Sequence, residues 1–288
     1  MDKQSKLALR ASVGVVVLAI QIAASSAQLT PEQANDAMTK LPWQQGPGQA
    51  ALGDKATVAL PPSTAFLPES GGSKFLELNG NLPAPGSSIL MASDWFAVFS
   101  FAASGYVKDD ETLDPDALLA TFKQNQEGAN EERVKRGLGK MYNDGWVVPP
   151  HYDPQTKYLE WGLRLHSDGS PEPIINYTVR MLGRSGYESV TLVSSPQMLD
   201  KNIADLKTSL KTFNFKSGEK YSEFRPGDHV AEFGLGALVL GGAAAAAVKT
   251  GLWKTLLVAL AASWKLVAAA VVIGLAGIKK LFTRDKPK

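Results

Sequence analysis

The sequence predicts an α+β fold, in which an antiparallel sheet carries packed helices, followed by C-terminal hydrophobic membrane helices. Three observations support this prediction. Two neighbouring segments alternate apolar and polar residues around a turn, which is typical of a β-hairpin with one buried face. Two further segments begin with residues that cap helices. From residue 233 onward, apolar residues dominate almost to the basic end of the chain.

The N-terminus has the three parts of a signal peptide. Met1 to Arg10 is short and basic, residues 11–24 are apolar, and Ser25-Ser26-Ala27 supplies the small residues that a signal peptidase reads. The apolar run of about 14 residues is shorter than the roughly 20 that a membrane span needs. We therefore expect a signal peptide over residues 1–27 and export across a bacterial inner membrane. An uncleaved signal anchor is the alternative.

The next segment, residues 28–55, is polar and rich in Gln, Gly and Pro, so it is interpreted as a leader with one short helix near Pro31 to Lys40. The exported α+β domain is predicted over residues 56–225. Its first strands are expected at Ala56 to Leu60 and at Asp94 to Ser104, which are rich in β-forming residues.

Helix signals follow in the middle of the domain. Asp114 is a good N-cap and Pro115 suits the first helical position, so a helix is predicted from there toward Arg136. The segment Gly145 to Pro154 is dense in Trp, Pro and Tyr. It is interpreted as a proline-stiffened connection that packs Trp146 inward, or alternatively as a recognition loop.

The clearest β signal is an alternating pair of segments, Tyr158 to His166 and Ile174 to Leu182, joined by turn-forming residues. A third strand is predicted at Tyr187 to Ser194. Ser195-Pro196 then caps a helix with an apolar stripe, and an edge strand is expected near Phe213 to Lys216. These helices are expected to pack on one face of the sheet.

Pairing the two alternating segments about the turn from Asp168 to Gly169-Ser170 predicts one polar sheet face. Trp161 then lies opposite Val179 on the apolar side, and Glu160 lies opposite Arg180 as a cross-strand ion pair. The candidate polar surface consists of Glu160, Arg164, Asn176, Thr178 and Arg180. Such a surface suits an anionic or carbohydrate-like ligand, although an ordinary solvated sheet face has the same composition.

The C-terminal part is predicted to lie in or on a membrane. The predicted segments are a juxtamembrane linker (226–232), a transmembrane helix (233–250), a second hydrophobic helix (251–281) and a basic tail (282–288). Small residues at high density, as in the first helix, let helices approach closely in lipid.

Lysines interrupt the second hydrophobic helix. Lys254, Lys265 and Lys279 fall within about 40° of one another on a helix, so they form one cationic stripe. The helix then lies in the interface, spans the membrane with Lys265 facing a partner helix or a wet seam, or forms a spanning hairpin with the first helix. Simple snorkelling of the lysines is also compatible. The residues expected to contact the membrane are Trp253, Lys254, Trp264, Lys265, Lys279 and Lys280.

Charges are divided unevenly along the chain. Between Gln28 and Val248 there are 19 basic and 26 acidic residues, whereas the chain from Lys249 onward has eight basic residues and one acid. Nucleic-acid binding needs a basic face on the folded part, so no nucleic-acid partner is expected. The sequence has no cysteine, which excludes thiol catalysis, iron–sulfur clusters and disulfides.

No catalytic or cofactor motif stands out in the sequence. The three histidines, His151, His166 and His229, lack metal-ligand spacing. No serine lies in a nucleophile-elbow pattern, and no phosphate-binding loop is present. We therefore expect no cofactor, no metal and no catalytic residues.

A set of short motifs is fairly specific. They are Gly145-Trp146, Tyr152-Asp153, Leu159-Glu160-Trp161, Asn176-Tyr177, Leu182-Gly183-Arg184-Ser185-Gly186, and Gly227-Asp228 through Ala231-Glu232-Phe233-Gly234-Leu235. Together they resemble the markers of a bacterial membrane-anchored family known only as domain of unknown function 2167. The resemblance covers most of the mature chain and implies an envelope location, a C-terminal anchor and no assigned activity. Leu206 to Phe215 is also similar, at the level of fold only, to small photosystem-type α+β sandwich domains.

These features predict a protein of the bacterial inner membrane whose main domain is periplasmic. The exported domain is expected to be a binding or interaction module rather than an enzyme, with inner-membrane lipid, a homo-oligomer or an envelope protein as partner. Two alternatives stay open: an envelope hydrolase or modifying enzyme with dispersed carboxylates, and a membrane-active oligomer. Two convergent acids with raised pKa values in a deep pocket would favour the enzyme.

Overall fold

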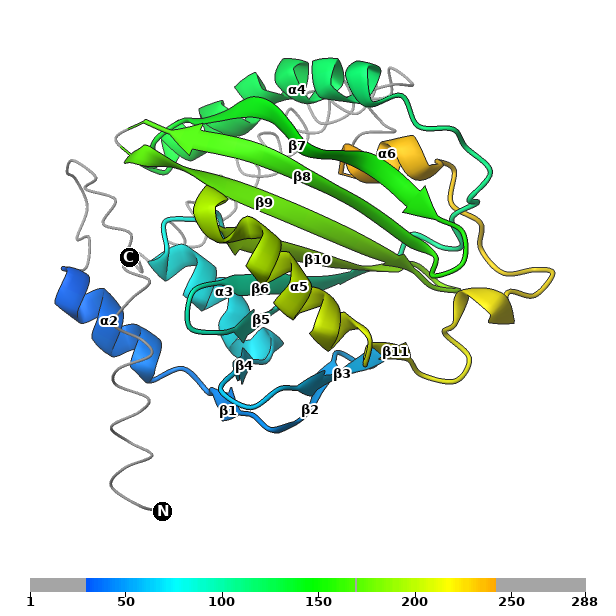
Figure 1. Cartoon of the computed structure of the whole chain (residues 1–288), viewed down its shortest axis with the longest axis horizontal. Coiled ribbons are helices and arrows are strands. Elements are labelled where there is room, and N and C mark those ends of the chain that lie inside the picture. Colours follow the sequence, from blue (N-terminus) through cyan, green and yellow to red (C-terminus); the bar gives the residue numbers. More distant parts are fainter. Residues whose placement is uncertain (1–29, 169, 242–288) are drawn as a thin grey trace, which may run out of the picture. The chain divides into compact units, whose positions relative to one another are not determined.

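The computed structural model describes residues 30–168 and 170–241, which form an α+β domain with two antiparallel sheets (Figure 1). The larger sheet has eight strands in the order β1-β4-β5-β6-β10-β9-β8-β7, and the smaller sheet has the order β11-β3-β2. The strands are β1 (Gln44–Gln45), β2 (Gly48–Leu52), β3 (Ala56–Leu60), β4 (Ala65–Leu67), β5 (Ser87–Met91), β6 (Phe96–Ala102), β7 (Met141–Asp153), β8 (Tyr158–Ser167), β9 (Ser170–Leu182), β10 (Tyr187–Ser194) and β11 (Asn214–Phe215). The helices are α2 (Pro31–Thr39), α3 (Glu69–Leu78), α4 (Pro115–Lys135), α5 (Leu199–Leu210) and α6 (Leu235–Val239), with the 3-10 turns η2 (Pro196–Met198) and η3 (Tyr221–Glu223). The predicted α+β class with an antiparallel sheet is confirmed.

Local signals located several elements correctly. Asp114 caps α4, since its Oδ1 accepts hydrogen bonds of 3.1 Å from the backbone N–H groups of Asp116 and Ala117. The strands predicted at Ala56–Leu60 and Tyr187–Ser194 match β3 and β10. The predicted last helix of the domain begins with the turn η2 and continues as α5.

The segment Gly145 to Pro154 is not the connection or recognition loop that was predicted. Most of it lies in β7, an edge strand of 13 residues. β7 shifts its register against β8 at three places, and such bulges accommodate glycine and proline at a sheet edge. Trp146 does pack inward, and its Nε1 donates a hydrogen bond of 3.0 Å to the carbonyl of Pro115.

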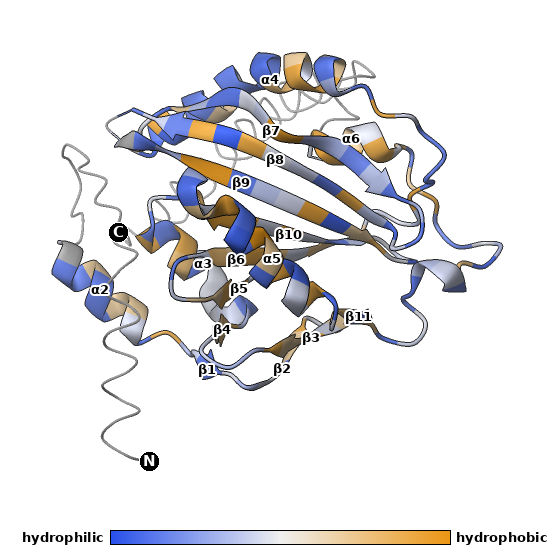
Figure 2. Cartoon of the chain, viewed as in Figure 1, coloured by the Kyte–Doolittle hydropathy of each residue, from blue (hydrophilic) through white to orange (hydrophobic). Residues whose placement is uncertain are grey.

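Helices cover both faces of the large sheet, not one face as predicted. On one face, here called the α5 face, α5 and the small sheet pack against Val179 and Leu192. On the other, called the α4 face, α4 and α6 pack against Leu159 and Trp161 of β8. One row of paired residues places α3 on the α4 face as well: Ile89, Val98, Thr191, Thr178 and Trp161. Figure 2 shows the alternating hydropathy along β8 and β9 that produces two faces.

The β8–β9 hairpin has a register one residue away from the predicted one. Glu160 lies opposite Val179, and Arg180 lies opposite Leu159. A register irregularity close to the turn separates the turn from the rest of the ladder. Because side chains alternate between faces, a shift of one residue places the two polar sets on opposite faces. The predicted ion pair between Glu160 and Arg180 is therefore wrong.

The predicted polar leader, residues 28–55, is in large part a piece of the domain. The short helix near Pro31 is present as α2. However, β2 pairs with β3 and buries Ala50 and Leu52 in the core on the α5 face. The predicted domain boundary at residue 56 is therefore wrong. α3, β4 and β5 were not predicted, because glycine, proline and serine interrupt residues 61–91 and hide these short elements.

The segment from Asp228 to Leu240 also belongs to the domain. Tyr106 pairs with it through two backbone hydrogen bonds of 2.8 and 2.9 Å. α6 then buries Leu235 and Leu238, each 0% exposed. The predicted linker at 226–232 and the predicted start of a transmembrane helix at 233 are therefore wrong. The error has a simple cause, since an apolar run of this length suits a buried core as well as lipid.

Within the described ranges, no helix is long and apolar enough to cross a membrane. The predicted signal peptide, the second hydrophobic helix and the basic tail lie outside the described residues, as does the first predicted span beyond residue 241. The predicted membrane-contacting residues Trp253, Lys254, Trp264, Lys265, Lys279 and Lys280 lie there too.

Candidate functional site

The structure divides the predicted polar surface between the two faces of the sheet. Glu160 and Arg164 lie on the α5 face, whereas Asn176, Thr178 and Arg180 lie on the α4 face. The five residues therefore do not form one site. Each group has to be considered with its own neighbours.

Glu160 on the α5 face already has partners within the fold. Its Oε2 accepts a short hydrogen bond from the hydroxyl of Tyr177 and lies 2.8 Å from Nζ of Lys207 and 3.6 Å from Nε2 of His151. Burial, together with the bond to Glu160, raises the pKa of Tyr177. These contacts connect α5 to strands β7, β8 and β9, so this cluster has a structural role.

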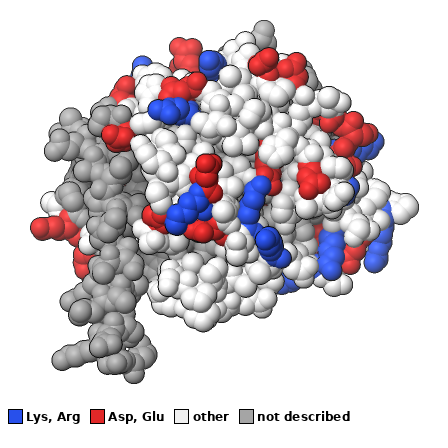
Figure 3. Space-filling view, viewed as in Figure 1, with Lys and Arg blue, Asp and Glu red and all other residues white. Residues whose placement is uncertain are grey.

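Arg164 is exposed on the same face. Its Nε lies 3.9 Å from Oδ2 of Asp144, which His166 also contacts at 2.7 Å. Figure 3 shows the side from which α5 is seen, and acidic and basic side chains are interspersed there. Exposed pairs of this kind contribute little to stability.

The three predicted residues on the α4 face lie in a polar patch on the central strands. Thr178 shares a hydrogen bond of 3.0 Å with Thr191 on β10. Arg180 lies directly opposite Ser189, which lies opposite Ser100 of β6. We call Asn176, Thr178, Arg180, Ser189, Thr191 and Ser100 the central patch.

A cavity of about 320 Å³ lies at a different place, beside the loop that joins β9 to β10. Its walls include Arg184 and Ser185 from that loop, together with Glu219, Asp228 and His229 from the segment after β11. The cavity therefore lies where the C-terminal segment of the domain crosses the end of the sheet.

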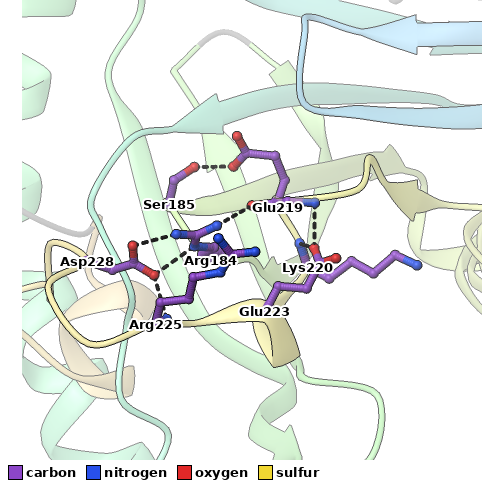
Figure 4. Close-up of polar contacts among 8 residues, drawn as sticks. Arg184, Ser185, Glu219, Lys220, Glu223, Arg225 and Asp228 are labelled. Atoms are coloured by element: carbon purple, nitrogen blue, oxygen red, sulfur yellow. Dashed lines mark hydrogen bonds and ion pairs between the residues drawn. The ribbon is translucent and has the colours of Figure 1, made fainter.

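Arg184 is fixed by a bidentate ion pair. Its Nη2 and Nε donate to the two carboxylate oxygens of Asp228 at 2.6 and 2.7 Å, and its Nη1 donates to the carbonyl of Gly218 at 3.3 Å (Figure 4). Asp228 also accepts a backbone hydrogen bond of 2.7 Å from Arg225. The hydrogen bonds from Arg184, and then from Arg225, lower the pKa of Asp228 to about 2.

Glu219, the second carboxylate of the cavity, is also paired. Nζ of Lys55 lies 2.6 Å from its Oε1, and the hydroxyl of Ser185 donates to its Oε2. Burial acts to raise the pKa of Glu219, but the bonds from Lys55 and Ser185 outweigh it and lower the pKa. Both carboxylates are therefore ionised at neutral pH, and neither is suited to act as a general acid there.

The loop itself depends on two closely packed glycines. A Cβ on Gly186 would lie 2.0 Å from the carbonyl oxygen of Ala102. A Cβ on Gly183 would lie 2.9 Å from the ring of Phe215. Glycine is needed at these positions because the backbone passes directly against its neighbours.

Sequence reasoning did not find this cavity. Arg184 and Asp228 are 44 residues apart, and Lys55 and Glu219 are 164 residues apart, so no local pattern joins them. The only signal was that Arg184 and Asp228 both occur in motifs that resemble a known family.

Comparisons with known proteins agree with that resemblance. The family described as "Protein of unknown function (DUF2167)" matches residues 44–275. No curated protein matches the chain. Among solved structures, cyanobacterial PsbP (CyanoP) from Synechocystis is similar, with 11% identity and a TM-score of 0.37, covering 58% of this chain and 91% of that one. The Ran-binding protein Mog1p from Saccharomyces cerevisiae is similar with 10% identity and a TM-score of 0.33, covering 63% of this chain and 100% of that one.

Proposed function

The chain belongs to the DUF2167 family of proteins of unknown function, and we propose that its described domain is the binding module of a bacterial envelope protein. In this proposal the protein is exported, and its apolar C-terminal part anchors it in the inner membrane with the domain on the periplasmic side. Its partners are then inner-membrane lipid and an envelope ligand or protein.

The observation that carries the proposal is how the C-terminal segment joins the domain. The bidentate pair of Arg184 with Asp228, the backbone pairing with Tyr106, and the buried helix α6 all hold residues 228–240. The backbone N–H of Gly236, at the start of α6, also donates a hydrogen bond of 3.0 Å to Oε2 of Glu111. We call the pair Arg184–Asp228 the clasp. The clasp, the pairing with Tyr106 and α6 together hold the chain against the domain as far as residue 240, and the apolar stretch of the sequence continues from there.

The state of the acidic groups favours binding over acid–base catalysis. Both carboxylates of the cavity, Glu219 and Asp228, are ionised and paired. The described residues include one carboxyl with a strongly raised pKa, Glu188, for which burial and then the charge of Glu69 give a value of about 8. Glu188 is only 2% exposed and does not line the cavity. The hydrolase alternative needs two convergent acids, so it has less support.

Cysteine labelling tests the proposed address, because the chain has no natural cysteine. The test variant is Val134→Cys, at a position on α4 that is 52% exposed. The matched buried control is Ala97→Cys, at a position that is 0% exposed. An impermeant thiol reagent added to intact spheroplasts should label the Val134→Cys variant. It should label the Ala97→Cys variant only after denaturation. The protein should also stay with the membrane in alkaline carbonate.

Two results would contradict this proposal. Labelling at position 134 that requires lysis of the spheroplasts would place the domain inside the cell. Release of the whole chain from the membrane by carbonate would contradict the proposed membrane anchor.

A further inference from the structure

Arg180 lies in a row of hydroxyl groups that crosses the middle of the large sheet. From β9 to β5, the paired residues on the α4 face are Arg180, Ser189, Ser100 and Ser87. None of the three serine hydroxyls makes a hydrogen bond to another described residue. Neighbouring strands are about 4.8 Å apart, and Ser189 lies directly across the ladder from Arg180. Arg180, Ser189 and Ser100 are each partly exposed, so the row reaches the surface.

Two aromatic rings orient the guanidinium of Arg180, and some of its N–H groups have no hydrogen-bond partner. Its central carbon lies 5.3 Å from the ring centre of Trp161 and 4.8 Å from that of Tyr187. Nη1 donates a hydrogen bond of 3.0 Å to the hydroxyl of Tyr187. Nε is buried and has no hydrogen-bond partner. Neither Nε nor Nη2 therefore donates a hydrogen bond to a described residue.

Arg180 also lacks a counter-charge. No carboxylate in the described part of the chain forms an ion pair with it, and burial lowers its pKa. Glu160 and Glu188, the acids on neighbouring strand positions, project from the opposite face of the sheet. A charge that is largely withdrawn from water and has no partner destabilises a fold. An anion bound to Arg180 would supply the missing counter-charge.

We propose that Arg180, together with Ser189 and Ser100, binds an oxyanion, the carboxylate or phosphate group of a small ligand. The free Nε–Nη2 edge matches two oxygens of such a group in a bidentate arrangement. The hydroxyl of Ser189 donates to the same group, and Ser100 extends the site along the row. Trp161 and Tyr187 fix the plane of the guanidinium and limit access of water to it.

This inference rests on the proposed binding role and names the ligand class. It does not depend on the clasp or on the membrane anchor, and its test is separate from theirs. Failure of anion binding would leave the labelling and carbonate results unchanged. Conversely, a cytoplasmic domain would still bind the anion.

The test is calorimetric titration of the full chain, in an uncharged detergent, with inorganic phosphate and separately with acetate at constant ionic strength. We expect saturable binding of at least one of the two anions at one site per chain. Arg180→Gln should weaken it by about tenfold or more, because the charge-assisted bonds are lost. Arg180→Lys should also weaken it, since lysine keeps the charge but has no planar fork.

Arg164→Gln is the matched control, because Arg164 is an exposed arginine on the opposite face of the same hairpin. It should bind the anion like the natural chain. Circular dichroism checks that each variant is folded. Equal binding by folded Arg180→Gln, or no binding of either anion by the natural chain, would overturn the proposal. A stronger preference for phosphate or for acetate would identify which oxyanion the ligand carries.

Discussion

Arg180 and Arg184 lie four residues apart at the end of β9, but their surroundings differ completely. Arg184, in the loop, has two hydrogen bonds to Asp228 and a third to a backbone carbonyl. Arg180, in the strand, is held between Trp161 and Tyr187 with no carboxylate partner among the described residues. The charge of Arg184 is therefore paired within the fold, whereas the charge of Arg180 is not paired by the described residues.

This difference in pairing distinguishes charges that stabilise the fold from charges that are candidates for binding a ligand. At the loop end of the β9–β10 hairpin, the partly buried charges of Arg184, Asp228 and Glu219 each have a partner. Within the paired strands, Arg180 and Glu188 lie on opposite faces, and neither has a counter-charge among the residues that the structure describes. Unpaired ionisable groups of this kind destabilise the domain unless they are neutral or bind a ligand.

The largest effect is expected for Glu188→Gln. Burial raises the pKa of Glu188 from 4.5 to about 8, so the native state binds this proton more tightly than the unfolded chain does. The stabilisation is complete below pH 4.5 and is lost as the pH rises through about 8. Between about pH 5 and about pH 9, the natural chain should lose roughly 4 kcal/mol of unfolding free energy through this group.

Glutamine stays neutral, so Glu188→Gln should remove that part of the pH dependence, as measured by urea unfolding at the two pH values. Glu131→Gln, on the exposed surface of α4, is the control and should keep the pH dependence of the natural chain. An unchanged pH dependence in Glu188→Gln would show that Glu188 is not a buried neutral carboxyl.

A smaller but clear loss is expected for Arg184→Met. The substitution leaves Asp228 without its counter-charge and frees the carbonyl of Gly218, so the clasp opens. The thermal midpoint should fall by several degrees, and the pKa of Asp228 should return toward its ordinary value. Arg225→Met is the control, because Asp228 contacts the backbone N–H of Arg225 rather than its side chain. Equal midpoints for the two variants would argue against the clasp.

A gain is expected for Arg180→Met in the absence of added anion. Methionine has similar bulk and no charge, so removing the unpaired cation should raise the unfolding free energy by about 1 kcal/mol. Urea unfolding measures this change. A clear loss of stability would mean that Arg180 supports the fold through Tyr187 and Trp161, as Arg184 does through Asp228.

The smallest effect is expected for Arg164→Gln. The side chain is 46% exposed and its ion pair with Asp144 is 3.9 Å long. Such a pair contributes little, so the unfolding free energy should change by less than about 0.5 kcal/mol. A larger change would show that the α5 face contributes more than its contacts indicate.

The sequence predicted those parts of the fold that depend on local chemistry. The N-cap at Asp114, the alternation in β8 and β9, and the limits of β10 were all correct because neighbouring residues determine them. Asn176, Thr178 and Arg180 share one face of β9 for the same reason, but the apolar residues Leu159 and Trp161 of β8, and not Glu160 and Arg164, share that face with them.

What failed depends on long-range pairing. The turn pairs Ser167 with Ser170, and the ladder runs one residue away from the predicted register, so Glu160 and Arg180 lie on opposite faces. The apolar residues of α6 resembled the start of a membrane span, because hydropathy does not distinguish a protein core from lipid. The clasp joins residues 44 positions apart, and only the three-dimensional fold brings them together.

The most direct test of this account compares the thermal midpoints of Arg180→Met and Arg184→Met, each with and without saturating phosphate or acetate. We predict that Arg180→Met is at least as stable as the natural chain and gains nothing from the anion. Arg184→Met should be less stable and should still be stabilised by the anion that the natural chain binds. If the anion stabilised Arg180→Met as much as the natural chain, the distinction between the two arginines would be contradicted.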